Sequence, residues 1–333
     1  MNLCRFMQIT GLLAVAGLTM AAPVRADIER TINKSYRVSP GGWLRIDSDL
    51  GTIQINSGAG DGVEITVLEI MDTSSEKEAD RILKDLQLDL VQEGSEVRVN
   101  ARYDRSSFLG WGNRRLKLRF TATVPARFNV DLRTAGGSIT VGALDGEVIA
   151  KTAGGSLNFG KITGPLKAKT SGGSIKVEEC RGDADLATSG GSISVGSSDG
   201  HVAARTSGGS IKVGSAAGMV QLATSGGSIS VDEIRGAIEA ATSGGGVSAG
   251  ITGQPQAPCR LSTSGGSVQV RLSPEVKLDI NASTSGGRVH TDFDILVRGN
   301  LTGSSLQGKL NGGGPELYLR TSGGNITIAK GEK

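Results

Sequence analysis

A tetrapeptide of threonine, then serine or alanine, then two glycines recurs ten times along this chain. The copies begin at Thr134, Thr152, Thr170, Thr188, Thr206, Thr224, Thr242, Thr263, Thr284 and Thr321. The interval between them is 18 residues six times, and then 21, 21 and 37. Six identical intervals cannot arise from composition alone. The chain is therefore predicted to be a stack of repeated units, each packed against its neighbours.

Each 18-residue unit, counted from its threonine, contains two short segments in which apolar and polar residues alternate. In the first unit they include Ile139 and Val141 at positions 6 and 8, and Val148 and Ala150 at positions 15 and 17. Alternation with a period of two predicts two strands, each with one buried face. Glycines at positions 3 and 4 predict one joining turn, and the glycine at position 13 predicts the other, where glycine adopts a positive φ at little cost.

Two strands and two turns fit one coil of a β-solenoid, whose coils stack about 4.8 Å apart. Ten such coils would form a rod about 45–50 Å long. Glycine supplies 51 of the 333 residues and aromatic residues only 3%, which agrees with tight turns and a narrow interior. The predicted fold is an all-β, single-chain β-solenoid (β-helix) of about ten coils with an 18-residue period.

The segment before the repeats, residues 27–133, is predicted to be a β-rich cap, because an uncovered coil would pair edge to edge with other chains. Five runs in it alternate like strands, at 43–47, 52–56, 63–68, 97–101 and 116–124. Ser75 with Glu78 predicts the capped start of one short helix that runs to about Leu86. In the repeat region, residues 134–333, the stretch 306–328 departs from the rhythm and is predicted to finish the stack.

Residues 1–26 have the pattern of a removable signal peptide. Arg5 precedes an apolar stretch at 9–22, and Val24 and Ala26 are the small residues expected before a cleavage site. Cleavage would remove Arg5 and Arg25 and lower the net charge from +3 to +1, too little to attract nucleic acid broadly. No later segment is apolar for the length of a membrane span. We expect an exported protein, periplasmic or extracellular at the cell surface.

Two cysteines, Cys180 and Cys259, remain after the predicted signal peptide. The register assigns Cys180 to position 11, in a turn, and Cys259 to position 15 about four coils further along, roughly 19 Å away. A disulfide needs Cα atoms within about 7 Å of each other. No disulfide is therefore expected, and both residues are predicted to be buried free thiols.

The chain resembles a bacterial family of exported β-strand-repeat proteins of unknown function, whose members are labelled adhesins and contain a toastrack-like domain. The matching residues are Val124 and Pro125 followed by 130–134, the Ser-Gly-Gly-Ser-Ile turns, and the stretch 317–328. The resemblance covers most of the chain after the signal peptide. It implies the solenoid fold and supplies no catalytic residues.

One polar cluster is a candidate site. Asp183 and His201 both occupy position 14, on adjacent coils, so they are expected to face outward within about 5 Å of each other. With Asp185 and Arg205 nearby, they would suit acid–base chemistry or a metal ion. The alternative is a solvated surface ion pair, which stabilises a protein little. The chain contains only 2 histidines, so we predict no metal site.

A second candidate is the loop at 104–115, in which Phe108 and Trp111 lie between basic residues. Two rings among positive charges suit a protein partner, a glycan or a membrane surface. The alternative is that both rings pack onto the cap. The faces of the predicted solenoid, by contrast, offer almost no aromatic side chains.

We expect a non-enzymatic structural or binding protein of the cell envelope, an adhesin or scaffold that presents a rigid solenoid surface to an envelope or cell-surface protein or a glycan. No catalytic residue and no cofactor is predicted. Two alternatives stay open. One is a periplasmic polysaccharide-acting enzyme on a β-helix, which would need paired acids and aromatic residues in a groove. The other is a partner of an envelope signalling system.

Overall fold

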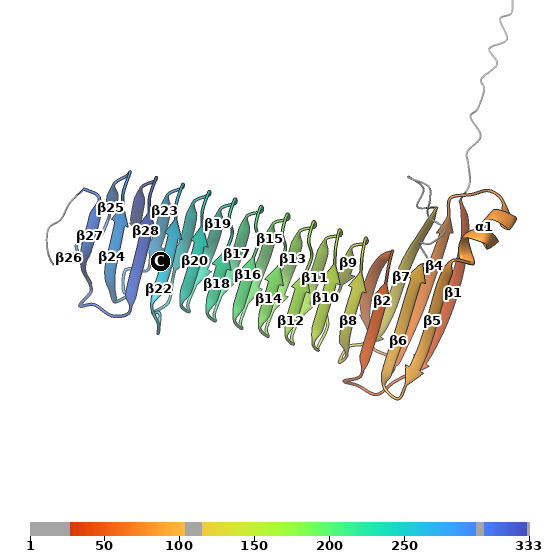
Figure 1. Cartoon of the computed structure of the whole chain (residues 1–333). Helices are drawn as coiled ribbons and strands as arrows, with labels where there is room; N and C mark the ends of the chain where they lie inside the picture. Colours follow the sequence, from red (N-terminus) through yellow and green to blue (C-terminus); the bar gives the residue numbers. More distant parts are fainter. Residues whose placement is uncertain (1–26, 104–114, 298–302, 332–333) are drawn as a thin grey trace, which may run out of the picture.

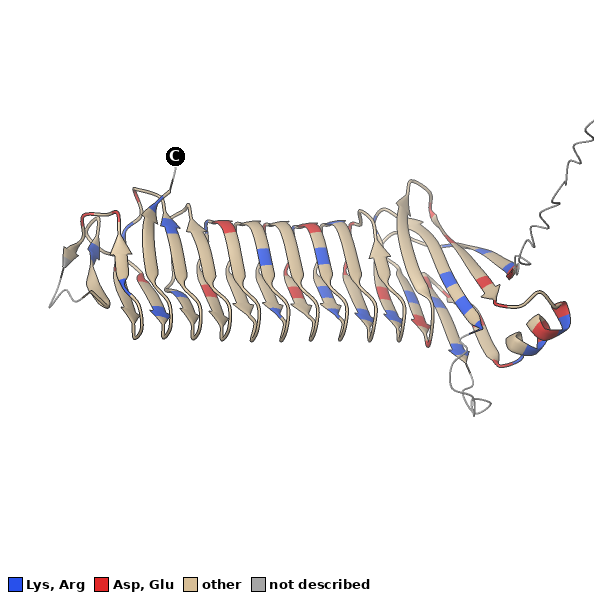
Figure 2. Ribbon diagram, turned by 90° about the horizontal axis from the view of Figure 1, so that it is seen from above, with Lys and Arg blue, Asp and Glu red and all other residues tan. Residues whose placement is uncertain are grey.

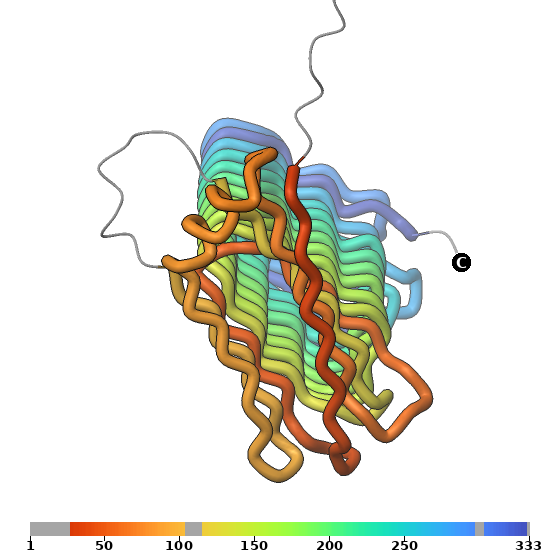
Figure 3. Tube along the Cα trace, turned by 90° about the vertical axis from the view of Figure 1, so that its right-hand side faces the viewer, coloured from red at the N-terminus to blue at the C-terminus, as the bar shows by residue number. Residues whose placement is uncertain are grey.

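The computed structural model describes residues 27–103, 115–297 and 303–331. These residues form two sheets that face each other along an elongated stack, with one helix, α1 (Glu76–Leu83), at its N-terminal end (Figures 1 and 3). Through the repeats the chain alternates between the sheets, so each coil contributes one strand to each sheet. The predicted all-β solenoid is confirmed.

The first sheet has 14 strands. In spatial order they are β1 (Ile28–Arg37), β4 (Gly62–Met71), β7 (Leu116–Pro125), β3 (Thr52–Gly58), β9 (Ile139–Val141), β11 (Leu157–Ile162), β13 (Ile175–Cys180), β15 (Ile193–Ser198), β17 (Ile211–Ala216), β19 (Ile229–Ile234), β21 (Val247–Ile251), β23 (Val268–Leu272), β29 (Ile326–Lys330) and β25 (Val289–Thr291).

The second sheet has 15 strands. Their order is β26 (Leu296–Val297), β27 (Ser305–Leu310), β24 (Leu278–Thr284), β28 (Glu316–Thr321), β22 (Cys259–Thr263), β20 (Ile238–Thr242), β18 (Val220–Ala223), β16 (Val202–Arg205), β14 (Ala184–Ala187), β12 (Leu166–Lys169), β10 (Val148–Thr152), β8 (Asn129–Thr134), β2 (Trp43–Ser48), β6 (Glu96–Tyr103) and β5 (Leu86–Glu93). Neighbours within the stack are parallel, and the antiparallel pairs lie at its two ends.

The regular coils pair in a register of 18 residues, as with Ile175 beside Ile193. Side chains at positions 6, 8, 15 and 17 are buried between the sheets, as predicted. Position 11 was predicted to lie in a turn, but it lies at the end of a strand. Cys180 ends strand β13 with its side chain buried, while Glu178 and Glu179 before it both remain at the surface. Two consecutive outward residues break the alternation and make position 11 an inward one.

The turns require glycine because there is no space for a Cβ atom, and not because the backbone has a positive φ. Positive φ angles occur at Gly41, Gly51, Gly94, Gly312 and Gly313, all outside the regular repeats. A Cβ atom built at the second glycine of a pair meets the backbone of the coil below: at position 191 it would lie 2.0 Å from a carbonyl oxygen. The position-13 glycines are equally confined, as at 200, where the distance is 2.4 Å. The prediction of positive φ at these turns was wrong.

The threonine of each repeat connects neighbouring coils. The Thr188 hydroxyl donates a hydrogen bond of 2.8 Å to the carbonyl of Gly173 in the coil below, and accepts one from the N–H of Gly191 in its own turn. The same donor bond recurs at the other regular threonines. Each buried hydroxyl is therefore satisfied, and each turn is fixed to the one below it.

Residues 27–133 continue both sheets of the repeats. Ser48 of β2 pairs with Thr134 of β8, and Ile53 of β3 pairs with Ile139 of β9. Strands β6 and β7 form a further level beyond β2 and β3. At about 4.8 Å per strand, the 14-stranded sheet spans about 60 Å, longer than ten coils alone.

Helix α1 is confirmed, but it is shorter than predicted, since Leu86 already belongs to β5. Ser75 makes no side-chain hydrogen bond at the helix start. Instead of completing a capping box, the Glu78 carboxylate accepts a hydrogen bond of 2.7 Å from Arg115. Arg30 of β1 donates to Glu76 and Asp80, which ties the helix to the first sheet.

The last repeat in the sequence is not the last in space. Strands β28 and β29 lie between the coil of β22 and β23 and the coil of β24 and β25. The stretch 306–328 was predicted to finish the stack, and this is wrong for most of its length. Of the strands in this stretch only β27 lies outside β24, with which it pairs antiparallel, and β26 forms the edge of the second sheet beyond it. The long interval before Thr321 gives the chain room to pass the outer coil and return.

Candidate binding surfaces

The outer face of the first sheet carries small polar and basic side chains at fixed intervals. In the column at position 7, Lys176 pairs with Ser194, which pairs with Lys212. Lysines in this column are thus two coils apart, about 9.6 Å. The Lys212 ammonium lies 3.5 Å from the carboxylate of Asp232. Figure 2 shows charged residues spread along the stack.

Asp183 and His201 are neighbours, but their contact runs through the backbone. The Asp183 carboxylate accepts a hydrogen bond of 2.9 Å from the backbone N–H of His201. Asn129 does the same for the N–H of Glu147, three coils earlier. The Asp183 side chain therefore joins two successive turns. In the described part of the chain, no group of three or more His, Cys, Asp or Glu side chains is arranged to hold a metal ion.

The other candidates from the sequence, Phe108 and Trp111, lie outside the described residues. The two cysteines are free and buried, on different sheets. Burial raises the pKa of Cys180 to about 11 and also raises the pKa of Cys259. Their thiols therefore stay protonated at neutral pH and act as small apolar groups. No helix in the described ranges is long and apolar enough to cross a membrane.

A dense patch of paired charges covers the outer face of β2, β6 and β8, near the N-terminal end. We call it the arginine–acid patch; its residues are Arg45, Asp47, Glu96, Arg98, Arg102, Asp131 and Arg133. Asp131 is only 5% exposed and accepts hydrogen bonds from Arg45 at 3.3 Å and Arg133 at 2.9 Å. Arg98 donates to Glu96 and lowers the pKa of that carboxyl.

The arginine–acid patch was not predicted from the sequence. Its signal was present, because arginine and acidic residues occupy the outward positions of three segments, such as Arg45 and Asp47 in one and Asp131 and Arg133 in another. The sequence pattern did not give the spatial order of these strands. Only the interleaving of β2 between β6 and β8 brings the three rows together.

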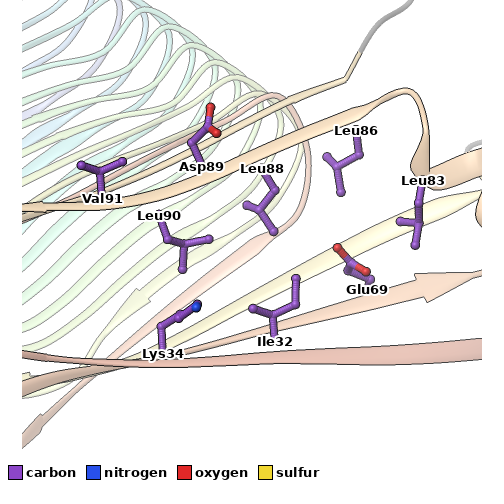
Figure 4. A pocket seen from close by; sticks show the side chains of 9 residues that line it. All are labelled: Ile32, Lys34, Glu69, Leu83, Leu86, Leu88, Asp89, Leu90 and Val91. Carbon is purple, nitrogen blue, oxygen red and sulfur yellow. The ribbon is translucent and has the colours of Figure 1, made fainter.

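An open groove of about 500 Å³ lies between the terminal strands β1 and β5 (Figure 4). Its lining is mainly aliphatic and includes Ile32, Leu83, Leu86, Leu88, Leu90 and Val91, with Lys34, Glu69 and Asp89. Glu69 is 6% exposed, and burial raises the pKa of its carboxyl while nearby Arg30 lowers it. This volume is in the usual range of binding pockets.

A scan of protein-family models and a search of curated proteins find no match to this chain. Among solved structures, a "putative adhesin" from Bacteroides fragilis is 12% identical with a TM-score of 0.35, over 90% of this chain and 97% of the other. A "putative cell adhesion protein" from Clostridium sporogenes is 11% identical with a TM-score of 0.21, over 91% and 100%. A "putative lipid binding protein" from Parabacteroides distasonis is 10% identical with a TM-score of 0.36, over 91% and 97%. Each of these likenesses extends over about nine tenths of this chain.

Proposed function

We propose that the protein is a non-enzymatic, exported binding protein of the bacterial cell envelope, an adhesin or a scaffold. One observation carries the proposal: the same hydrogen bonds join every regular coil to the next, through the threonine hydroxyl and the turn backbone. Outward side chains are thereby held about 4.8 Å apart along a long, straight surface. Such a surface suits a large or repetitive partner, an envelope protein or a glycan, better than a small substrate.

The partner could bind the outer face of either sheet, and substitutions on each face distinguish the two. Lys176→Ser with Lys212→Ser removes the two lysines of the position-7 column on the first sheet's face, using the residue that already occupies alternate positions in that column. Arg45→Gln with Arg133→Gln disrupts the arginine–acid patch on the second sheet. The protein from residue 27 onward is used for pull-down from envelope fractions and for a glycan array. One variant is expected to lose most of the binding, by about fivefold or more, and the other little.

Cell fractionation of the bacterium that produces the protein tests export. The proposal fails if the protein stays in the cytoplasm, or if neither envelope proteins nor glycans bind the wild type. Asp183→Asn and His201→Ala test the enzymatic alternative, since they alter the acid and the histidine that occupy the same position on adjacent coils. A polysaccharide-cleaving activity that these variants abolish, with the fold intact by circular dichroism, would contradict the non-enzymatic assignment.

A further inference from the structure

The two ends of the stack are closed differently. In the described part of the chain, the C-terminal edges are β25 with 3 residues and β26 with 2. The N-terminal edges are β1 with 10 residues and β5 with 8. Each of these two pairs with only one strand, β1 with β4 and β5 with β6. A long unpaired edge is a template for another strand, and proteins usually shorten or block it.

Both long edges border the groove (Figure 4), and side-chain contacts join the surrounding elements at each of its ends. At one end α1 is tied to β1 by Arg30, which lies 2.8 Å from Glu76 and 2.7 Å from Asp80. At the other end the Gln92 side chain donates a hydrogen bond of 2.6 Å to the carbonyl of Arg37. Between these contacts, the row of leucines on β5 remains partly exposed over the end of the core.

Glu69 gives the groove a specific polar group. It interrupts the inward apolar row of β4, between Val67 and Met71, and points into the groove (Figure 4). Arg30 is its cross-strand neighbour, but the Arg30 guanidinium is engaged by the two acids of α1. Among the described residues no hydrogen bond reaches the Glu69 carboxylate. One arginine thus faces three carboxyl groups, and the groove has room for another cation.

We propose that the edge of β5 binds an extended segment of a partner protein, with alternating apolar and polar residues and one lysine or arginine in the apolar row. The added strand would pair with the β5 backbone and place its apolar row over Leu86, Leu88 and Leu90. Its cation would reach Glu69. The β1 edge is less suited, because a strand added there would be separated from β4 and its Glu69 by β1 itself.

A second copy of this chain fits the groove less well than a foreign segment. Strand β5 reads Leu-Gln-Leu-Asp-Leu-Val-Gln-Glu and contains no basic residue. A symmetric pair of β5 strands would therefore bring further acids to the groove and leave Glu69 without a cation. The proposed strand site lies on the end of the stack and not on its outer faces, so it stands or fails independently of the adhesin or scaffold proposal.

The test uses synthetic peptides and the protein from residue 27 onward. The probes are acetylated, amidated octapeptides of alternating threonine and valine, with one lysine placed in turn at each position of the valine row. A matched set carries glutamate in place of lysine. Binding is measured by fluorescence anisotropy. At least one lysine peptide is expected to bind about tenfold or more tightly than its glutamate counterpart. Amide exchange should slow at 86–93 and not at 28–37.

Glu69→Gln should remove the preference for lysine, because it keeps the shape and deletes the charge. Glu64→Gln is the matched control, since Glu64 lies on the same strand with its side chain exposed on the opposite face. The proposal is overturned if no lysine peptide binds, or if lysine and glutamate peptides bind equally. It is also overturned if sedimentation shows self-association through β5 that the peptides do not displace, because the occupant would then be a second copy.

Discussion

At the scale of single residues, the repeat depends on a threonine and the second glycine of each pair acting together. The threonine hydroxyl bonds to the glycine carbonyl of the coil below and receives the glycine N–H of its own turn. Close stacking of the turns makes both bonds possible, and it leaves no room for a Cβ atom at the second glycine. The first glycine has no such restriction: a Cβ at position 190 would be 3.5 Å from its nearest neighbour.

Gly191→Ala is therefore expected to destabilise the protein strongly, by roughly 2–4 kcal/mol, because the added methyl group would overlap the backbone of the coil below. Gly190→Ala should change the stability by less than about 0.5 kcal/mol, since it adds ordinary contacts at a normal φ. Thermal unfolding followed by circular dichroism compares the two variants. Equal effects would show that space at the second glycine does not limit the packing of the turns.

Glu69 predicts a pH dependence of stability. Burial raises the pKa of its carboxyl in the folded protein above the ordinary value of 4.5, so the folded state binds this proton more tightly than the unfolded chain. The contribution to stability is present below about pH 4.5 and is lost as the pH rises through the folded pKa. Glu69→Gln should therefore raise the melting temperature at pH 7, with the difference shrinking toward pH 4. Glu64→Gln, on the exposed face of the same strand, is the matched control.

At the scale of elements, both ends of the stack use the same device. At each end, two coils that are neighbours in space are separated in the sequence by the outer coil. At the N-terminal end β2 and β3 precede the outer β6 and β7, and at the C-terminal end β28 and β29 follow the outer β24 and β25. The outer coils are closed by antiparallel strands. The last strands of the chain, β28 and β29, therefore lie inside the stack, whereas β1, the first described strand, forms the edge of the first sheet.

Cysteine cross-linking tests this order directly. Arg320 of β28 pairs with Ser262 of β22 on one side and with Ser283 of β24 on the other. In a background of Cys180→Ala and Cys259→Ala, the pair Ser262→Cys and Arg320→Cys should form a disulfide, since neighbouring strands are about 4.8 Å apart. The pair Ser262→Cys and Ser283→Cys, about 9.6 Å apart, should not. Mass spectrometry of oxidised protein distinguishes the two results.

At the scale of the whole molecule, the segment before the repeats and the repeats form one continuous pair of sheets. Small-angle X-ray scattering should show a rod whose length follows the number of strand levels. Deletion of residues 189–224, two complete coils, preserves the register and should shorten the rod by about 9.6 Å without changing its cross-section. A changed cross-section, or loss of the folded state, would mean that the coils are not interchangeable.

Much of this architecture was readable from the sequence. The period of 18 residues and the alternation within it predicted the coil, its buried columns, the neighbouring positions of Asp183 and His201, and the absence of a bond between Cys180 and Cys259. These features repeat at fixed spacing, and parallel stacking converts sequence spacing directly into spatial neighbourhood. Strands β1 and β5 were not predicted, because β1 mixes basic and apolar residues inward and β5 adjoins the helix.

What the sequence alone determined is the repeating coil, because its pattern follows from the two-residue period of a strand and the identity of equivalent positions. The tertiary structure decided the order of the coils at both ends, and with it the arginine–acid patch and the groove beside Glu69. It also showed why the glycines are required. These features depend on which distant segments become neighbours and on the space left between their backbones. A local pattern of residues determines neither the neighbours nor the space.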